Sequence, residues 1–333
     1  MTFVADGRTC RPKTIMQMFA RILLCRIFPV FVGALSLSQT GGFSNEPRVN
    51  PDHVAIRVNS DLVQIPVTVF DRNDQFVVGL DKENFKLFDD RVEQVITHFA
   101  IEDVPLSVGF VFDASASMRD KIQQSREAAT NFLKTANPGD EFFLVQFNNH
   151  VEMAIDLCTS IQEIQNQLKF IRPAGQTALL DAIHFSISRM NKGTNARKAL
   201  IIISDGGDNC SRHTLADLKN LVRETDVQVY ALGIFDPWEK RSQTPEALNG
   251  PSLLRGVTKQ SGGHLFEIED VSQLPDVASK IGKALRAQYV LGYAPKATLR
   301  DGKYHHVEVK LAQPKGLRKL QASWRRGYYA PVE

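Results

Sequence analysis

The pattern of apolar and polar positions is clearest over Leu106–Phe112, which is a nearly unbroken apolar run. Such runs are typical of strands that are buried on both faces, as in a parallel sheet covered by helices. Apolar residues at helical spacing follow from Ile122 to Ala136. The sequence therefore predicts a buried strand, a polar loop over 113–118 and a helix.

The segment 104–289 continues to alternate between strand and helix patterns. Further strands are expected at Glu141–Phe147, Val151–Leu157, Ala199–Ile203, Val227–Ile234 and His264–Ile268. Further helices are expected at 161–170, from Thr177, at Leu215–Val222, at Leu253–Thr258 after a polar excursion over 236–251, and at 274–285. The Asn148-Asn149 turn is short enough for a hairpin, so the third strand should be antiparallel and at an edge. The pattern predicts a doubly wound α/β domain with a mainly parallel sheet.

The segments 54–103 and 290–333 carry strand patterns without helices. Strands are expected at Leu62–Phe70, around Phe85 and Leu87, at Val95–Phe99, at Tyr289–Tyr293, at Tyr304–Leu311 and at Leu320–Trp324. Fewer than about 50 residues are too few for an independent core. We therefore expect the two ends to pair into one β-sandwich with the α/β domain inserted between them. The alternative is two separate small sheets, or one sheet packed directly on the α/β domain.

Residues 1–38 have the order of an export signal, with basic residues before the apolar stretch Ile27–Leu37 and the small residues Ser36 and Ser38 at its end. The stretch is short for a membrane span, but an uncleaved N-terminal anchor is the alternative. A linker over 39–53 follows. The sequence predicts an exported protein that is periplasmic, in the cell envelope or secreted.

Composition adds the size and the charge. A chain of 333 residues with 43% apolar and 23% charged residues suits roughly two soluble globular domains. The net charge of +3 comes from residues 1–38, where five basic residues face one acidic residue, so the remainder has a net charge near −1. The charge gives no basis for binding to nucleic acid.

Cysteine usage is informative because Cys10 and Cys25 fall in the expected signal, which leaves Cys158 and Cys210. Two cysteines in an exported chain favour a disulfide. The strand order, however, places these two at opposite edges of the sheet. A strand of six residues spans about 20 Å, whereas bridged Cα atoms lie within about 7 Å of each other. We therefore predict two free thiols.

Oxygen-bearing side chains gather where the central strands end. Asp113, Ser115 and Ser117 follow the first strand, Thr177 follows a loop, and Asp205 follows the strand Ala199–Ile203. The strand directions bring all five to one edge of the sheet, where open α/β sheets bind ligands. Carboxylates and hydroxyls without cysteine or histidine suit Mg²⁺, Mn²⁺ or Ca²⁺ and do not suit Zn²⁺.

The motifs DASASM at 113–118, GQTA at 175–178 and SDG at 204–206 resemble the metal-ion-dependent adhesion site of von Willebrand factor type A domains. The resemblance covers about 104–289. The flanking parts, with the ending GYYAP at 327–331, resemble those of exported Acidobacteria-type proteins that carry such a domain.

The resemblance implies a role for each matching residue. Ser115 and Ser117 would bind the ion directly, Thr177 would bind directly or through water, and Asp113 and Asp205 would act mainly through water. Neutral direct ligands leave the ion most of its charge and an open position. The resemblance therefore implies an adhesion-type, protein-binding module whose ion binds an acidic side chain of a partner.

Each residue also has a plain structural interpretation. Asp113, Ser115, Ser117 and Thr177 could cap helices, and Asp205 precedes a glycine in a common turn pair. We interpret Asp208 as a turn or cap residue and His184 as a packed or exposed helix residue. His305 and His306 are interpreted as strand surface, with a metal-binding role as the less favoured alternative. Trp238 is a loop aromatic that either packs or contacts a partner.

Enzyme functions find less support. Asp113 could accept a phosphoryl group, but such sites place a second aspartate where Ser115 stands. There is no glycine-rich phosphate loop and no Gly-x-Ser-x-Gly elbow. We therefore expect no enzyme. A structural component of an envelope assembly, with a metal that stabilises the fold, is the main alternative, and a metal-dependent hydrolase is the other.

Overall fold

The computed structural model describes residues 62–235, 245–295, 301–312 and 319–332. The expected signal or anchor, the linker 39–53, residues 54–61 of the N-terminal β segment and Trp238 lie outside the described residues. Within the described ranges, no helix combines the length and the apolar composition that a membrane span requires.

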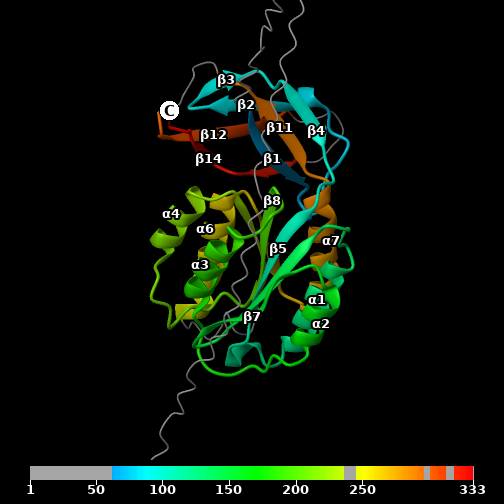
Figure 1. The fold of residues 1–333 in the computed structure, drawn as a ribbon, viewed down its shortest axis with the longest axis vertical. Coiled ribbons are helices and arrows are strands. Elements are labelled where there is room, and N and C mark those ends of the chain that lie inside the picture. Colours follow the sequence, from blue (N-terminus) through cyan, green and yellow to red (C-terminus); the bar gives the residue numbers. More distant parts are fainter. Residues whose placement is uncertain (1–61, 236–244, 296–300, 313–318, 333) are drawn as a thin grey trace, which may run out of the picture. The chain divides into compact units, whose positions relative to one another are not determined.

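A six-stranded sheet forms the centre of the α/β domain (Figure 1). Its strand order is β10-β9-β8-β5-β6-β7. Its strands are β5 Leu106–Asp113, β6 Glu141–Phe147, β7 Val151–Cys158, β8 Arg197–Ser204, β9 Val227–Ile234 and β10 Leu265–Ile268. All neighbouring strands are parallel except β6 and β7, which form an antiparallel hairpin at one edge. The predicted doubly wound α/β domain is confirmed, including its antiparallel edge strand.

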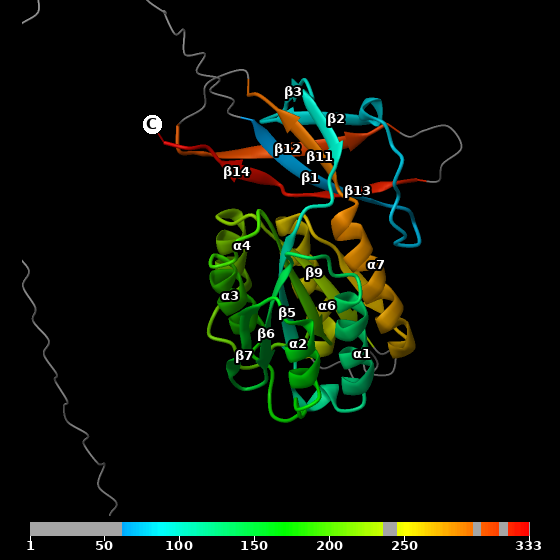
Figure 2. The same cartoon turned by 45° about the vertical axis from the view of Figure 1, so that its right-hand side comes forward.

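Helices cover both faces of this sheet. They are α1 Ile122–Leu133, α2 Ile161–Leu168, α3 Leu179–Met190, α4 Leu215–Arg223, α6 Pro245–Ser261 and α7 Leu274–Arg286. Phe110 and Phe112 pack with α1, α2 and α7, whereas Val111 packs with α3, α4 and α6 on the other face. Figure 2 shows α1 and α7 on one side of the sheet and α3 and α4 on the other. Successive residues of a strand point to opposite faces, so every residue of β5 is buried.

Two helix starts differ from the prediction. The helix expected from Thr177 begins at Leu179. The helix expected at Leu253 begins at Pro245 and continues through Pro251, so part of the expected polar excursion is helical. A Gly-Pro pair commonly interrupts a helix. Here the helix continues, and it packs so closely that a Cβ on Gly250 would lie only 3.0 Å from the backbone of Gly206.

The flanking segments form two four-stranded sheets, with the orders β13-β1-β11-β4 and β14-β12-β2-β3. Their strands are β1 Val63–Phe70, β2 Phe85–Asp89, β3 Val92–Gln94, β4 His98–Ile101, β11 Tyr289–Tyr293, β12 Tyr304–Leu311, β13 Gln321–Trp324 and β14 Gly327–Tyr329. β1 pairs with β11 and β13, and β2 pairs with β12. Each sheet therefore contains strands from both ends of the chain.

The two sheets share one core, to which Val67 and Tyr289 contribute from the first sheet and Leu87 and Val309 from the second. The expected β-sandwich is therefore present. The strand expected at Val95–Phe99 is wrong, because β3 ends before it in one sheet and β4 begins within it in the other. The chain crosses between the sheets there, which interrupts the alternation. β14 was not predicted.

A buried polar network joins the β-sandwich to the α/β domain. The side-chain amide of Gln288 lies within 3.0 Å of Thr68 Oγ1 and the Tyr230 hydroxyl, and it donates to Gln228 Oε1 at 2.8 Å. Burial raises the pKa of Tyr230 to about 12, so its hydroxyl is a neutral hydrogen-bonding partner. Because Gln228 lies near the start of β9, the sandwich contacts the end of the sheet opposite to the loops that follow the parallel strands.

The close packing around β5 gives a test of this fold. A Cβ on Gly109 would overlap the Phe143 ring and lie 2.6 Å from Leu200 Cδ2. We expect Gly109→Ala to lower the free energy of unfolding by about 1–3 kcal/mol, measured by urea titration, because the core has no room to adjust. Gly256→Ala in α6 is the matched control, since the nearest atom lies 3.4 Å away. The control should raise the free energy of unfolding by roughly 0.5–1 kcal/mol. Equal effects of the two substitutions would contradict the packing of β5.

Candidate metal centre

The predicted site lies where the direction of strand addition reverses. β5 has β8 on one side and β6 on the other, and ligands of open α/β sheets bind beyond the strand ends at such a point. Asp113 ends β5 and Ser204 ends the neighbouring β8. The loops that begin at these two residues therefore start side by side.

Asp113 is fully buried at the base of the site. Its Oδ1 accepts a hydrogen bond from the backbone N–H of Ser115 at 2.8 Å, and its Oδ2 accepts one from the Ser204 hydroxyl at 2.6 Å. Burial, followed by the charge of Asp205, raises the pKa of Asp113 to about 7, although these hydrogen bonds oppose the shift. The two carboxylates therefore repel each other, and a cation between them would relieve the repulsion.

Ser115 and Ser117 are neighbours above this carboxylate, with their hydroxyl oxygens 3.1 Å apart. Ser115 is buried and Ser117 is exposed. Ser115 stands at the N-cap of the 3-10 turn Ala116–Met118, but its side chain makes no capping hydrogen bond there. The residue that caps α1 is Lys121. The structure therefore contradicts the interpretation of the two serines as helix caps.

Thr177 is held beside the loop that follows Asp205. Its N–H donates to Asn209 Oδ1 at 2.9 Å, and its carbonyl accepts from the N–H of Asn209 at 3.0 Å. The N-cap of α3 is Ala178, so Thr177 is not the cap. The preceding Gly175 accepts a hydrogen bond from the N–H of Ala116 at 3.1 Å, which ties this loop to the serine loop.

Asp205 is paired with a lysine that the motif analysis missed. Lys121 Nζ lies 3.5 Å from Asp205 Oδ2, and the two side chains are only 7% and 10% exposed. The ammonium offsets part of the negative charge of the site. The only sequence signal for this role is that Lys121 lies at the start of the helix after the serine motif.

The remaining polar residues have separate positions. Asp208 was expected in a turn or at a helix cap; it follows β8 and accepts a hydrogen bond from the N–H of Leu180, in the first turn of α3, at 3.2 Å. His184 is half-buried and stacks on His213 with ring centres 3.8 Å apart. His306 is exposed on β12 as expected, but the expectation of strand surface is wrong for His305, which is 4% exposed.

The two cysteines of the described residues are both free, as predicted. Cys158 ends β7 opposite Phe142, at the start of β6. The N–H of Cys210 donates to the Thr177 carbonyl, among the loops at the opposite end of the parallel strands. The length of the strands therefore separates the two thiols.

The structure thus joins Asp113, Ser115 and Ser117 directly, brings Asp205 into electrostatic contact with Asp113, and ties the Thr177 loop to the other two loops. The side chains are hard oxygen donors with an excess of negative charge. They fit Mg²⁺, Mn²⁺ or Ca²⁺.

The comparison with protein families decides the identity of this domain. The model described as von Willebrand factor type A domain matches residues 107–280. This chain belongs to the von Willebrand factor type A family. Domains of the family are commonly metal-dependent protein-interaction modules.

Known relatives of this von Willebrand factor type A (VWA) protein include inter-alpha-trypsin inhibitor heavy chains. Heavy chain 4 of Mus musculus is 26% identical over 237 residues, which are 63% of this chain and 24% of that protein. Heavy chain H2 of Mus musculus is 26% identical over 153 residues, or 41% of this chain and 16% of that protein. The matches thus cover a quarter or less of each relative.

Two solved structures are also similar. The first is a von Willebrand factor type A protein from Catenulispora acidiphila, with 15% identity and a TM-score of 0.49, covering 83% of this chain and 75% of that one. The second is proximal thread matrix protein 1 from the mussel byssus, with a zinc-occupied MIDAS motif. It has 19% identity and a TM-score of 0.48, covering 60% of this chain and 50% of that one.

The Ser204 hydrogen bonds give a stability test of the site. Ser204→Ala removes the donor to buried Asp113 and also the acceptor for the N–H of Gly206. We expect the free energy of unfolding to fall by about 1–3 kcal/mol in urea titrations, since buried polar groups lose their partner. Ser188→Ala, an exposed serine on α3, should change it by less than about 0.5 kcal/mol. A loss no larger than that of the control would show that Asp113 does not depend on Ser204.

Proposed function

We propose that the VWA domain binds one divalent cation, Mg²⁺ or alternatively Mn²⁺ or Ca²⁺, through Asp113, Ser115, Ser117, Thr177 and Asp205. The ion would bind an acidic side chain of a protein partner. The observation that carries the proposal is the convergence of three loops with oxygen-bearing side chains at the switch point of the sheet, tied together by backbone hydrogen bonds.

The spacing of the serine hydroxyls supports direct binding by both. Octahedral Mg²⁺ with ligands at 2.0–2.1 Å places adjacent ligand oxygens about 2.9 Å apart. The hydroxyl oxygens of Ser115 and Ser117 are 3.1 Å apart, so they can occupy adjacent positions with little movement.

The hydrogen bonds of Asp113 support an indirect role for its carboxylate. Both of its oxygens already accept a hydrogen bond, one from Ser115 and one from Ser204. A carboxylate in this position supplies negative charge and can orient bound water, while the neutral hydroxyls bind the ion. The ion then keeps most of its charge, and exposed Ser117 marks the side open to a partner.

Experiments can distinguish this proposal from two other functions, a structural component of an envelope assembly and a metal-dependent hydrolase. In a structural component of an envelope assembly, the ion would stabilise the fold, so chelation would unfold the protein. In the adhesion-type module, chelation would abolish partner binding and leave the fold intact. A metal-dependent hydrolase would need a turnover assay, and we propose that the protein is not an enzyme.

We propose that 104–289 is the VWA domain, and that 54–103 and 290–333 are the β segments that flank it. We also propose that residues 1–38 direct export to the periplasm, the cell envelope or the exterior, and that the membrane is contacted only if this segment stays as an anchor. No nucleic acid is proposed as a partner.

Calorimetric titration with Mg²⁺ and Mn²⁺ tests the metal proposal. We expect one ion per chain, and we expect Asp113→Ala to abolish the binding because it removes the buried charge of the site. Asp120→Ala removes an exposed carboxylate two residues after the motif and should leave the affinity unchanged within about twofold. Unaltered affinity in Asp113→Ala would refute the assignment.

A pull-down from envelope extract with and without EDTA tests the binding role. If Thr177 shifts from water-mediated to direct coordination when a partner binds, Thr177→Ala should weaken partner binding far more than metal binding. Thr130→Ala, on α1 away from the loops, should change neither. A parallel loss of both affinities in Thr177→Ala would show that Thr177 is only a ligand, and partner capture that persists in EDTA would contradict the role of the ion.

A further inference from the structure

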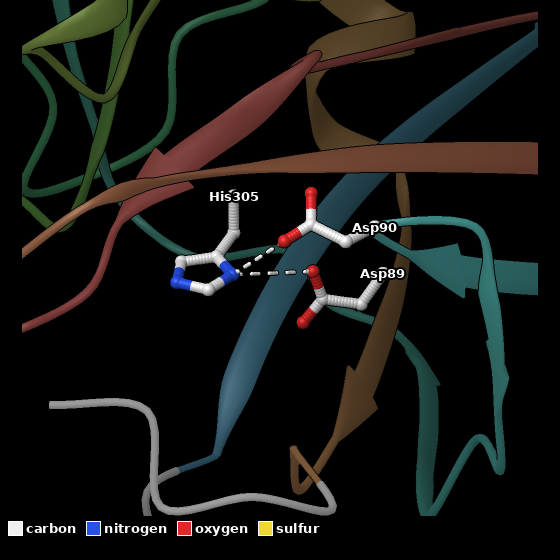
Figure 3. Close-up of side chains that lie close together, drawn as sticks. All are labelled: Asp89, Asp90 and His305. Carbon is white, nitrogen blue, oxygen red and sulfur yellow. Dashed lines mark hydrogen bonds and ion pairs between the residues drawn. The ribbon is translucent and has the colours of Figure 1, made fainter. Parts of the chain in front are cut away.

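A second cluster of metal-ligating side chains lies in the β-sandwich. Asp89 ends β2, Asp90 begins the turn to β3, and His305 lies on the neighbouring strand β12. One ligand atom from each lies within 4.8 Å of the other two. Figure 3 shows the His305 ring nitrogen facing a carboxylate oxygen of both aspartates. The cluster shares no residue with the VWA site.

Asp89 carries an unsatisfied buried oxygen that faces the histidine. The residue is 4% exposed. Its Oδ2 accepts hydrogen bonds from the hydroxyls of Tyr293 at 2.9 Å and Tyr328 at 3.0 Å. Its Oδ1 has no hydrogen-bond partner among the described residues and lies 3.9 Å from His305 Nδ1. Buried carboxylate oxygens are rarely left without a donor or a cation.

Asp90 and His305 each have a second polar atom that faces away from the cluster and makes a hydrogen bond elsewhere. Asp90 Oδ1 accepts the backbone N–H of His306 at 2.9 Å, which leaves Oδ2 facing His305. His305 Nε2 lies 3.2 Å from Asp301 Oδ1. A carboxylate that accepts Nε2–H selects the tautomer whose Nδ1 has a free lone pair, as in many metal-binding histidines.

A protonated His305 is the competing interpretation. Burial lowers the pKa of His305, but hydrogen bonding to Asp301 and the charges of Asp90 and Asp89 raise it overall. The two N–H groups of an imidazolium would reach Asp90 at 2.8 Å and Asp301 at 3.2 Å. Asp89 Oδ1 would still lack a donor, and one positive charge would face both Asp89 and Asp90, while Asp301 also pairs with Lys303 at 3.6 Å. A divalent ion in place of the Nδ1 proton would serve all three inward atoms.

The distances suit a small tetrahedral ion. Ligands at about 2.0–2.1 Å from Zn²⁺ lie about 3.3 Å from one another. His305 Nδ1 lies 2.8 Å from Asp90 Oδ2 and 3.9 Å from Asp89 Oδ1, so both separations are within about 0.6 Å of that value. The Asp90 side chain is 50% exposed, so the site opens to solvent on one side and leaves room for water as a fourth ligand.

We propose that Asp89, Asp90 and His305 form a Zn²⁺ site in the β-sandwich, separate from the VWA site. One imidazole and two carboxylates favour Zn²⁺ over Mg²⁺ and Ca²⁺, which prefer oxygen ligands alone. The aspartates belong to the N-terminal β segment and the histidine to the C-terminal one. The ion would therefore link the two segments from which the sandwich is assembled, and part of its binding energy would stabilise the fold.

Zinc titration of Asp113→Ala tests the proposal, because this variant removes the VWA site as a competing metal site. We expect one Zn²⁺ per chain in competition with a chromogenic chelator, together with a rise in Tm. Asp113→Ala/His305→Gln should lose more than about 100-fold in affinity, since removal of a ligand exceeds the effect of an outer partner. The rise in Tm should disappear with it.

Three further variants make the outcome decisive. Asp90→Asn changes a half-exposed turn residue, so this variant should fold even if His305→Gln does not. Its affinity for Zn²⁺ should fall in the same way. Asp301→Asn should weaken binding by about 10–100-fold by releasing the ring. Glu93→Gln, at an exposed position of β3, removes one negative charge nearby and should leave the Zn²⁺ affinity unchanged. Absence of Zn²⁺ binding in Asp113→Ala, or unchanged affinity in Asp90→Asn, would overturn the proposal. Neither result would bear on Mg²⁺ binding by the wild-type VWA site.

Discussion

The buried carboxylate of Asp113 is the constraint on which the arrangement of the α/β domain depends. It ends a strand in which every residue is buried, so it has to be satisfied by the protein or by an ion. The Ser115 backbone and the Ser204 hydroxyl each donate to it. These two bonds fix the first turn of the serine loop and connect the end of β5 to the end of β8. The geometry of the VWA site therefore follows from the hydrogen bonds that hold the Asp113 carboxylate at the end of an apolar strand.

The same constraint is consistent with the proposed role of the site, in which a bound ion is shared with a partner. The carboxylates lie at the base and beside Lys121, whereas the serine hydroxyls lie above them. In the proposed site, an ion held by these hydroxyls would keep most of its charge, and a partner carboxylate would complete its coordination. Gly250 and Gly206 approach closely enough that α6 packs against the Asp205 loop. The position of that loop therefore depends on α6 as well as on the sheet.

The β-sandwich is assembled from segments that lie far apart in the sequence. Its two sheets each combine strands from both ends of the chain, so the sandwich forms only when the ends meet across the inserted α/β domain. Gln288 and Tyr230 join the two parts through a buried network. The cluster around His305 lies where strands of the two ends pair, and its mixed nitrogen and oxygen donors differ in chemistry from the all-oxygen VWA site.

The sequence by itself determined the elements whose burial is periodic and the order of the site motifs. The apolar run at 106–112 and the hairpin after Glu141–Phe147 correspond to β5, β6 and β7, because period and turn length are local properties. Strand order then placed the loops of the proposed metal site at the same end of the sheet. Only the tertiary structure decided the helix through Pro251, the break between β3 and β4, and the burial of Lys121 and His305. These features depend on which distant segments pack together, and a local pattern of apolar and polar residues does not specify that partner.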